Sequence, residues 1–330
     1  MFYYNYIEND YQLIIGSNNK SKGGLHMKKY RFLFLTMVLS LVLAGCGNTE
    51  SAEESEETAM KEYTTDAGET IEIPEDPQRI VVMATSYFGN FKQLDANMVG
   101  AHSVVTESEV LEPLTEGVEM VEEGNIEQIM ALDPDLIIAF STDENLEKFE
   151  SVAPTIPVQY EKWNYLDIHE EFGKIIGKED EAAEWVDEWE SALEEDKASV
   201  EDAVGTDVTA SVVEQYAKDI YVYGTNWGRG TEIIYQGLGL GVPEAVESEV
   251  VETGWKNISA EEVGKYAGDF MFVGTGDSGA DNAYRETNVW KDLDAVENGR
   301  VIEFDSPVFY YNDPYSLEHQ KEIIVGALTE

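Results

Sequence analysis

Cations and cysteine are both scarce in this sequence. Only 21 Lys and Arg stand against 67 Asp and Glu in 330 residues, a net charge of −46. Nucleic-acid binding depends on clustered cations that displace counterions, so this composition excludes a nucleic-acid partner. Cys46 is the only cysteine, which rules out an internal disulfide framework and a zinc cage of the CxxC type.

Apolar and aromatic residues, by contrast, are plentiful. Apolar residues make up 43% of the chain, which includes 18 Tyr, 12 Phe and 6 Trp. Such a composition supports a sizeable core despite the charge, and it excludes disorder for most of the chain. The length predicts two domains, or two lobes of one.

The N-terminal region has the features of a lipoprotein signal over residues 27–45. Basic residues follow Met27 and precede an apolar run over 32–44. The run is too short to span a bilayer, which needs about 20 apolar residues. It ends in Leu-Ala-Gly-Cys, which resembles the lipobox of bacterial lipoproteins, where the cysteine is diacylated; Cys46 is then the lipidated residue. Residues 1–26 carry no targeting pattern, so we expect translation to start at Met27.

A flexible acidic tether is expected over residues 46–62, because this stretch is rich in Ser, Glu, Thr and Ala and lacks aromatics.

Five of the 21 cations and two of the 67 acids precede Cys46, which leaves 16 cations against 65 acids and a net charge of −49 for residues 46–330. Lys and Arg are depleted along all of residues 46–330, which a local binding patch would not produce. We therefore expect a source organism that lives in saline surroundings and is either halophilic or alkaliphilic.

Strands alternate with helices through the rest of the chain. The β-branched or alternating runs predict strands at 70–77, 79–84, 135–140, 155–160, 209–215, 219–224, 269–274 and 301–305. Helical patterns lie at 143–150, 166–177, 230–238, 261–266 and 314–328. This alternation predicts an α/β fold with two Rossmann-like lobes and mainly parallel sheets. Ligands are expected at the ends of the strands.

A long helix is predicted over 178–204, a stretch without Gly or Pro. Trp185, Trp189 and Leu193 recur at a spacing of four, which places them on one face. At 1.5 Å per residue the helix would be roughly 40 Å long, enough to join an N-terminal lobe at 63–177 to a C-terminal lobe at 205–330. A helical connection resists hinge closure between the lobes.

A weak internal repeat supports two related lobes. Asp135 lies eight positions after Glu127 and precedes a buried strand. Asp269 lies eight positions after Glu261 and also precedes a buried strand. Each repeat is expected to be a short helix that begins near the glutamate and feeds the strand.

Several segments together resemble the helical-backbone class of ABC-transporter substrate-binding proteins. They are the lipobox, the first strand Pro-Gln-Arg-Ile-Val-Val at 77–82, the segment 126–138 and the long helix. Tyr-Val-Tyr-Gly-Thr-Asn-Trp-Gly-Arg-Gly at 221–230 and Phe-Tyr-Tyr-Asn-Asp-Pro at 309–314 narrow the resemblance to the ferric-hydroxamate siderophore binders of Gram-positive bacteria. The resemblance implies a monomeric, lipid-anchored, extracellular receptor that passes a ferric siderophore to an ABC permease dimer with its ATPase.

The candidate ligand-binding residues of the second lobe follow its strands. Tyr221 and Tyr223 share a face of their strand, which leads into a Gly-punctuated loop with Trp227 and Arg229. Glycines on both sides are expected to leave the guanidinium accessible, and the resemblance implies ligand contacts for Trp227, Arg229 and Tyr221. After the last strand it favours Tyr310, with Tyr311 as the alternative. The facing wall of the first lobe is expected from residues that follow its strands: Tyr160, Trp163 and Tyr87.

The charge of the pocket favours a neutral ligand. Only four arginines follow Cys46, so one pocket arginine suits a neutral ferric trishydroxamate better than a tris-catecholate complex with about three negative charges. The chelate supplies every iron ligand, so no metal-binding residue and no cofactor are expected. A haem or cobalamin-type tetrapyrrole is the alternative, with Met83 or His169 as the axial ligand. We expect no enzymatic activity. Carboxylate pairs could otherwise indicate acid–base catalysis, but in so acidic a chain they occur everywhere and do not indicate a catalytic site.

The resemblance also implies a docking surface. In this class one acidic residue on each lobe engages arginines on the two halves of the permease, and the matching positions are Glu127 and Glu261. The alternative is that both are ordinary first-turn acids favoured by the helix dipole.

Overall fold

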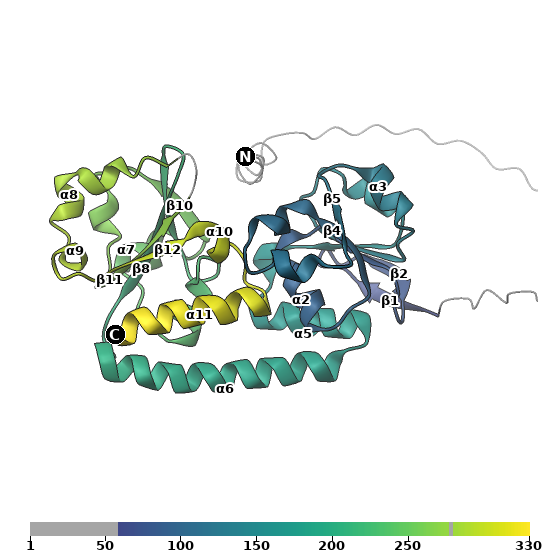
Figure 1. The fold of residues 1–330 in the computed structure, drawn as a ribbon, viewed down its shortest axis with the longest axis horizontal. Helices are drawn as coiled ribbons and strands as arrows, with labels where there is room; N and C mark the ends of the chain where they lie inside the picture. Colours follow the sequence, from purple (N-terminus) through teal and green to yellow (C-terminus); the bar gives the residue numbers. More distant parts are fainter. Residues whose placement is uncertain (1–58, 277–279) are drawn as a thin grey trace, which may run out of the picture. The chain divides into compact units, whose positions relative to one another are not determined.

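The structure, a computed structural model, describes residues 59–276 and 280–330, which fall within one compact unit, Glu56–Glu330 (Figure 1). The upstream stretch 1–26, the signal at 27–45 and the lipidation site Cys46 lie outside the described residues. None of the helices in residues 59–276 and 280–330 has the length and hydrophobicity of a membrane-spanning segment.

A β-hairpin begins where the acidic tether was expected to continue. Strand β1 (Met60–Thr64) pairs antiparallel with β2 (Thr70–Pro74). The prediction of a tether through residue 62 was therefore wrong at its end. Alternation explains the strand, because Tyr63 and Ile71 pack against the core of the first lobe while Glu62 is exposed.

The first lobe contains a five-stranded sheet in the order β5-β4-β3-β6-β7, and all neighbouring strands are parallel. Its strands are β3 (Ile80–Val82), β4 (Met98–His102), β5 (Glu119–Val121), β6 (Leu136–Phe140) and β7 (Thr155–Val158). Three of them were predicted. The helical segments are η1 (Thr85–Tyr87), α2 (Phe88–Gln93), η2 (Ser103–Glu107), η3 (Glu112–Thr115), α3 (Ile126–Ala131), α4 (Leu146–Glu150), η4 (Tyr160–Lys162) and α5 (Tyr165–Ile176).

The second lobe has a mixed sheet in the order β10-β9-β8-β11-β12. Its strands are β8 (Ala210–Tyr216), β9 (Asp219–Tyr223), β10 (Trp255–Ile258), β11 (Phe270–Thr275) and β12 (Val301–Asp305). β8, β11 and β12 are parallel, whereas β9 is antiparallel to both of its neighbours. Mainly parallel sheets are thus confirmed for the molecule, but the end of β9 lies at the opposite edge from the carboxyl ends of β8 and β11.

The helices of the second lobe are mostly short. They are η5 (Glu232–Gly237, a π-helix), α7 (Glu244–Glu249), η6 (Val263–Lys265), η7 (Ala283–Glu286), α8 (Asn288–Lys291), α9 (Asp294–Glu297), α10 (Ser306–Phe309) and α11 (Pro314–Thr329). The helix predicted over 261–266 was wrong in extent, because only the single 3₁₀ turn η6 forms there. The one predicted over 230–238 forms as η5.

The internal repeat has a structural counterpart. Asp135, just before β6, accepts hydrogen bonds from the backbone N–H groups of Gln78 and Arg79 at 2.7 and 2.9 Å, ahead of β3. Asp269, just before β11, accepts one from the N–H of Thr209 at 2.8 Å, ahead of β8. In each lobe the aspartate therefore ties together the starts of two adjacent parallel strands.

The predicted long helix is confirmed as α6 (Glu179–Val204), which joins the lobes along the lower edge of Figure 1. Trp185 and Trp189 lie stacked at 5.7 Å, and Trp189 Nε1 donates to the hydroxyl of Tyr165 on α5 at 2.9 Å. Farther along the helix Leu193 packs against Gly237 of η5. One apolar face of α6 thus covers the cores of both lobes.

The C-terminal segment does not belong to the second lobe alone. Tyr311 is part of the apolar core of the first lobe, and Tyr315 packs against that core. Asp313, the N-cap of α11, lies so close to Gly89 of α2 that a β-carbon there would stand 1.8 Å from its Oδ1. The boundary predicted for the second lobe, 205–330, therefore misses a second connection between the lobes.

Candidate ligand-binding site

The loop after β9 holds three consecutive left-handed residues. Gly228, Arg229 and Gly230 have φ angles of 67°, 59° and 75°. A β-carbon at Gly228 would lie 2.8 Å from the carbonyl oxygen of Tyr310, so glycine is required there. The N–H of Gly228 donates to Glu232 Oε1 at 2.9 Å, and that of Arg229 to the carbonyl of Phe309 at 2.6 Å. Backbone hydrogen bonds thus fix the position of Arg229.

Arg229 lies at the centre of a buried polar cluster. Its Nε donates to Glu214 Oε2 at 3.2 Å, and the hydroxyl of Tyr223 donates to the same oxygen at 2.9 Å. The guanidinium carbon lies 4.7 Å from the ring centres of both Tyr223 and Tyr310, a cation–π distance. Burial raises the pKa of Tyr223 well above 10, so its hydroxyl stays a donor. The expected accessibility of Arg229 was wrong, since only 8% of it is exposed.

Trp227 is half-buried and faces the first lobe. Its ring packs on Gly254, where a β-carbon would stand 2.4 Å from Cε3. Tyr160 meets the indole edge-on, with ring centres 5.6 Å apart. Because Tyr160 belongs to the first lobe, these two predicted residues form an aromatic contact between the lobes.

Polar contacts join the lobes next to this aromatic pair. Asn226 Nδ2 donates to the carbonyl of Trp163 at 3.3 Å, and Asn312 Nδ2 donates to the hydroxyl of Tyr160 at 3.4 Å. Trp163 itself is turned toward the hairpin, since its Nε1 lies 3.0 Å from Asp66 Oδ2. The structure therefore brings Tyr160, Trp163 and Trp227 to one region.

Three other predicted tyrosines lie beneath this surface. Tyr87 is 2% exposed and packs edge-on against Phe172 at 4.9 Å. Tyr311 is 3% exposed and its hydroxyl donates to the carbonyl of Val104 at 3.4 Å. Tyr221 is buried against Trp255 at 5.6 Å. These tyrosines support the site from behind, whereas the half-buried Tyr310 packs against Arg229.

Sequence reasoning missed several residues of the site. Glu214 and Gly254 were not considered, and Tyr223 was noted only as a neighbour of Tyr221. An acid within the apolar run Ala-Ser-Val-Val-Glu-Gln-Tyr was a usable signal for Glu214, although acids are common everywhere in this chain. Glu232 is a second buried carboxyl group, and burial raises its pKa.

The candidate axial ligands for a tetrapyrrole are in the core of the first lobe. Met83 is buried among apolar residues, and His169 is fully buried. Desolvation lowers the pKa of His169 to about 4. His169 packs against Trp185 of α6, with ring centres 4.8 Å apart, and Met83 packs in an apolar cluster, so this arrangement does not fit the tetrapyrrole alternative. Across the residues that the structure describes, no three or more His, Cys, Asp or Glu side chains are grouped to hold a metal ion.

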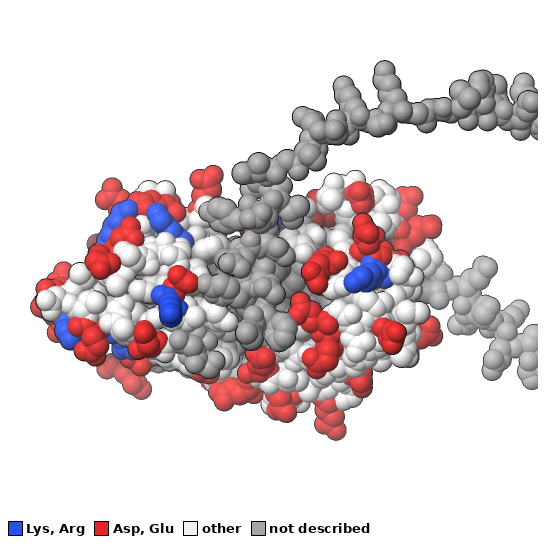
Figure 2. Space-filling view, turned by 90° about the horizontal axis from the view of Figure 1, so that it is seen from above, with Lys and Arg blue, Asp and Glu red and all other residues white. Residues whose placement is uncertain are grey.

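The two candidate docking residues are exposed on different lobes. Glu127 lies in the first turn of α3, and Glu261 lies in the turn before η6. Neither carboxylate has a hydrogen bond or ion pair among the described residues. Acids of both lobes are scattered over the face shown in Figure 2, with few cations between them.

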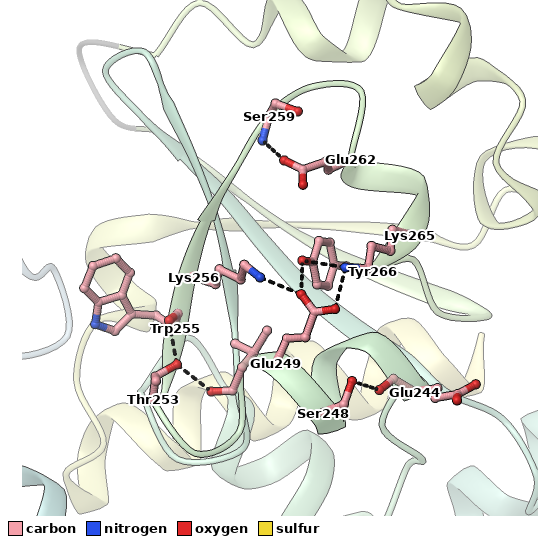
Figure 3. A network of polar contacts seen from close by, with 11 residues as sticks. Glu244, Ser248, Glu249, Thr253, Trp255, Lys256, Ser259, Glu262, Lys265 and Tyr266 are labelled. Atoms are coloured by element: carbon pink, nitrogen blue, oxygen red, sulfur yellow. Dashed lines mark hydrogen bonds and ion pairs between the residues drawn. The ribbon is translucent and has the colours of Figure 1, made fainter.

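Next to Glu261 the surface is held by a polar network around Glu249 (Figure 3). Lys256 and Lys265 each lie 2.5 Å from one of its oxygens, and the Tyr266 hydroxyl donates to Oε2 at 2.8 Å. These hydrogen bonds hold the pKa of Glu249 at about 2. The glutamate that caps the following turn is Glu262, which accepts from the N–H of Ser259 at 3.0 Å. Capping therefore does not explain the acid at position 261, because Glu262 is the capping residue.

Comparisons with known proteins agree with this architecture. The profile of the periplasmic binding protein family matches residues 80–308. The chain is 38% identical over 312 residues to the iron(3+)-hydroxamate-binding protein FhuD of Bacillus subtilis (strain 168), covering 92% of this chain and 98% of that protein.

Two solved structures are similar in fold and sequence. The FhuD protein from S. pseudintermedius has a TM-score of 0.79 at 40% identity, covering 82% of this chain and 99% of that one. FhuD2 from Staphylococcus aureus with bound ferrioxamine B has a TM-score of 0.73 at 37% identity, covering 77% and 98%. With two lobes joined by α6 and a family profile that spans both, the chain belongs to the periplasmic binding protein family.

Proposed function

We propose that this protein is a receptor for a ferric hydroxamate siderophore, which it binds where Trp227, Tyr160, Tyr310 and Arg229 meet and then delivers to an ABC permease for iron uptake. The observation that carries the proposal is the cluster at Arg229, a single guanidinium that packs against two tyrosine rings beside the inter-lobe contact of Trp227 and Tyr160. The relative FhuD is named as an iron(3+)-hydroxamate-binding protein, and the S. aureus relative holds ferrioxamine B.

The chemistry of the residues suits such a ligand. Aromatic rings cover the hydrocarbon linkers of a siderophore, and the guanidinium donates to hydroxamate oxygens. Tyr310 is the better candidate for a ligand contact than Tyr311, because Tyr311 is buried in the core of the first lobe. Trp227 and Tyr160 come from opposite lobes, so a ligand that packs on this pair touches both. The iron is cargo held by the chelate, and the protein binds it without a cofactor and without catalysis.

The location follows from the signal region. Lipidation of Cys46 would anchor the protein, as a monomer, to the outer face of a Gram-positive membrane. The hairpin that begins at Met60 is the first described strand after this anchor.

Delivery requires contact with a permease. We assign this contact to Glu127 and Glu261, one exposed carboxylate on each lobe. Both are available to arginines of a partner, because neither is held by another side chain of the described residues. A permease dimer with its ATPase is the partner that would present one arginine cluster to each lobe.

The proposal is tested by tryptophan-fluorescence titration, since Trp227 and Trp163 lie at the site. The purified protein is titrated with ferric hydroxamates, ferric catecholates, haem and cobalamin. We expect saturable quenching by hydroxamates. Quenching by haem or cobalamin alone would overturn the proposal.

A further inference from the structure

A buried carboxylate lies beside the guanidinium of the site. Glu214 is the only acid in β8, its neighbours Val212 and Val213 are fully buried, and it is itself 1% exposed. An ionised carboxylate in such a strand is strongly unfavourable unless it is paired and hydrogen-bonded. Its presence therefore needs an explanation beyond packing.

The partners of Glu214 come from the site. Oε2 accepts from the Nε of Arg229 at 3.2 Å and from the hydroxyl of Tyr223 at 2.9 Å. Arg229 is the cation of this pair and Tyr223 adds a donor without a charge. The two opposite charges thus lie next to each other inside the protein, where water screens them little.

The fold leaves room for this carboxylate and does not satisfy it completely. On the adjacent strand β11, a β-carbon at Gly274 would come within 3.0 Å of Cγ of Glu214 and 2.8 Å of Oγ of Ser306. Neither Oε1 of Glu214 nor Oγ of Ser306 has a hydrogen-bond partner in the described part of the chain. Buried polar atoms are normally satisfied, and a buried carboxylate is costly to leave partly unpaired, so the position of Glu214 calls for an explanation.

We propose that Glu214 determines the ligand selectivity of this site by cancelling the charge of Arg229, so that the site gives anionic iron chelates no advantage over chelates without net charge. The inference rests on the proposed function. A ferric ion is balanced by three hydroxamates, whereas three catecholates leave the complex with three negative charges. Arg229 donates to Glu214 through Nε and to the carbonyl of Trp227 through Nη1 at 3.4 Å, and the pair as a whole contributes no net charge.

One ligand scaffold with three charges isolates this effect. Ferrioxamine B carries a free amine and is a monocation, its N-acetyl derivative is neutral, and its N-succinyl derivative is a monoanion. Affinities are measured by calorimetry in 0.5 M NaCl, which screens exposed acids such as Asp305 and Glu109 but hardly affects a buried pair. For the wild-type protein we expect the three affinities to agree within about threefold.

Variants then change the charge of the pair. Glu214→Gln leaves Arg229 uncompensated and should raise the ratio of N-succinyl to free-amine affinity by about tenfold. Glu214→Asp keeps the charge but alters the fit, so the ratio should stay near the wild-type value. Arg229→Gln with Glu214→Gln restores neutrality and should restore the ratio even where affinity is lost. Glu297→Gln removes one exposed charge from the same lobe and is the matched control.

The outcomes separate the two proposals. Failure of the wild type to bind any of the three chelates would refute the siderophore receptor itself. Binding with the same ratio in Glu214→Gln as in the wild type would refute charge compensation and leave the receptor standing. The wild type alone also tests the inference if Glu214→Gln does not fold, because a tenfold preference of the wild type for the monoanion would mean that Arg229 is not compensated.

Discussion

Gly254 lies directly against the indole of Trp227, with space for a hydrogen and not for a methyl group. A β-carbon at this position would stand 2.4 Å from Cε3 and 2.8 Å from Cζ3 of the ring. Gly254 also has a φ of 79°, and its carbonyl accepts from the N–H of Gly224 at 2.7 Å. The aromatic contact between the lobes therefore depends on a glycine in another loop.

Replacing this glycine should displace Trp227. We expect Gly254→Ala to weaken ferric hydroxamate binding at least about tenfold, since the ring must leave its position against Tyr160. Gly299→Ala is the matched control, because Gly299 has a φ of 67° but no atom within 4 Å of the added carbon. Both variants should lose about 1 kcal/mol of stability from the left-handed backbone. Equal affinities by calorimetry would contradict the assigned position of Trp227.

The two direct ligand contacts should differ in their effect on stability. Trp227→Ala and Arg229→Ala should each weaken ligand binding by about 10- to 150-fold, the loss of about 1.5–3 kcal/mol. Only Arg229→Ala leaves Glu214 buried without its cation, so it should also lose about 3–5 kcal/mol of unfolding free energy. Calorimetric affinity and urea unfolding measure the two effects. Unchanged binding in both variants would place the ligand elsewhere.

The buried histidine predicts a loss of stability in acid. His169 Nδ1 lies 3.1 Å from Asn90 Nδ2, and burial lowers its pKa to about 4 from an unfolded value near 6.5. As the pH falls below 6.5 the unfolded chain takes up the proton first. Stability is therefore full above this value and is lost as the pH falls toward 4, by about 3 kcal/mol in all.

The measurement compares the unfolding free energy of the wild type with that of His169→Gln between pH 7.5 and 4.5. The difference between the two proteins should shrink or reverse as the pH falls, because the variant has no imidazole to protonate. The comparison is needed because Asp313 acts in the opposite direction, with burial raising its pKa to about 6. A pH-independent difference between the two proteins would show that His169 does not titrate as inferred.

The excess of negative charge predicts stabilisation by salt. A net charge of −46 repels itself in the folded state, and added ions reduce this repulsion. The melting temperature should rise with NaCl, by about 2–4 °C for each 1 kcal/mol of repulsion relieved. Choline chloride at equal ionic strength should act alike, since screening does not depend on the cation. A flat or falling melting temperature up to molar NaCl would exclude the mechanism.

Local sequence patterns were sufficient for β3, β6 and the long helix, but they missed β4, β5 and β10. Ile80–Val82 and Leu136–Phe140 are continuous apolar runs, and the spacing of the apolar residues in α6 defines its buried face. The direction of β9 was not predictable, because the turn before it consists of Ala217 and Lys218, which are not typical hairpin residues. Ala217 nonetheless adopts a φ of 52° there.

The site was predictable only in part. Trp227 and Arg229 stood out because glycines surround them in a loop, but the contacts between Arg229, Glu214 and Tyr223 depend on the antiparallel register of β8 and β9. No local pattern distinguishes Tyr310 from Tyr311, because each follows the same strand. The difference arises from tertiary packing, which places Tyr311 in the core of the first lobe.

Docking should be separable from ligand binding. Glu127 and Glu261 are exposed, and neither contacts Trp227 or Arg229, so Glu127→Ala with Glu261→Ala should leave siderophore affinity unchanged. Uptake of the ferric siderophore by cells should be abolished, because the permease would lose a carboxylate on each lobe. Glu123→Ala with Glu297→Ala is a suitable control, since it removes one exposed acid from each lobe. Wild-type uptake by the first double variant would remove both residues from the docking surface, and weakened ligand binding would mean that they lie nearer the ligand than proposed.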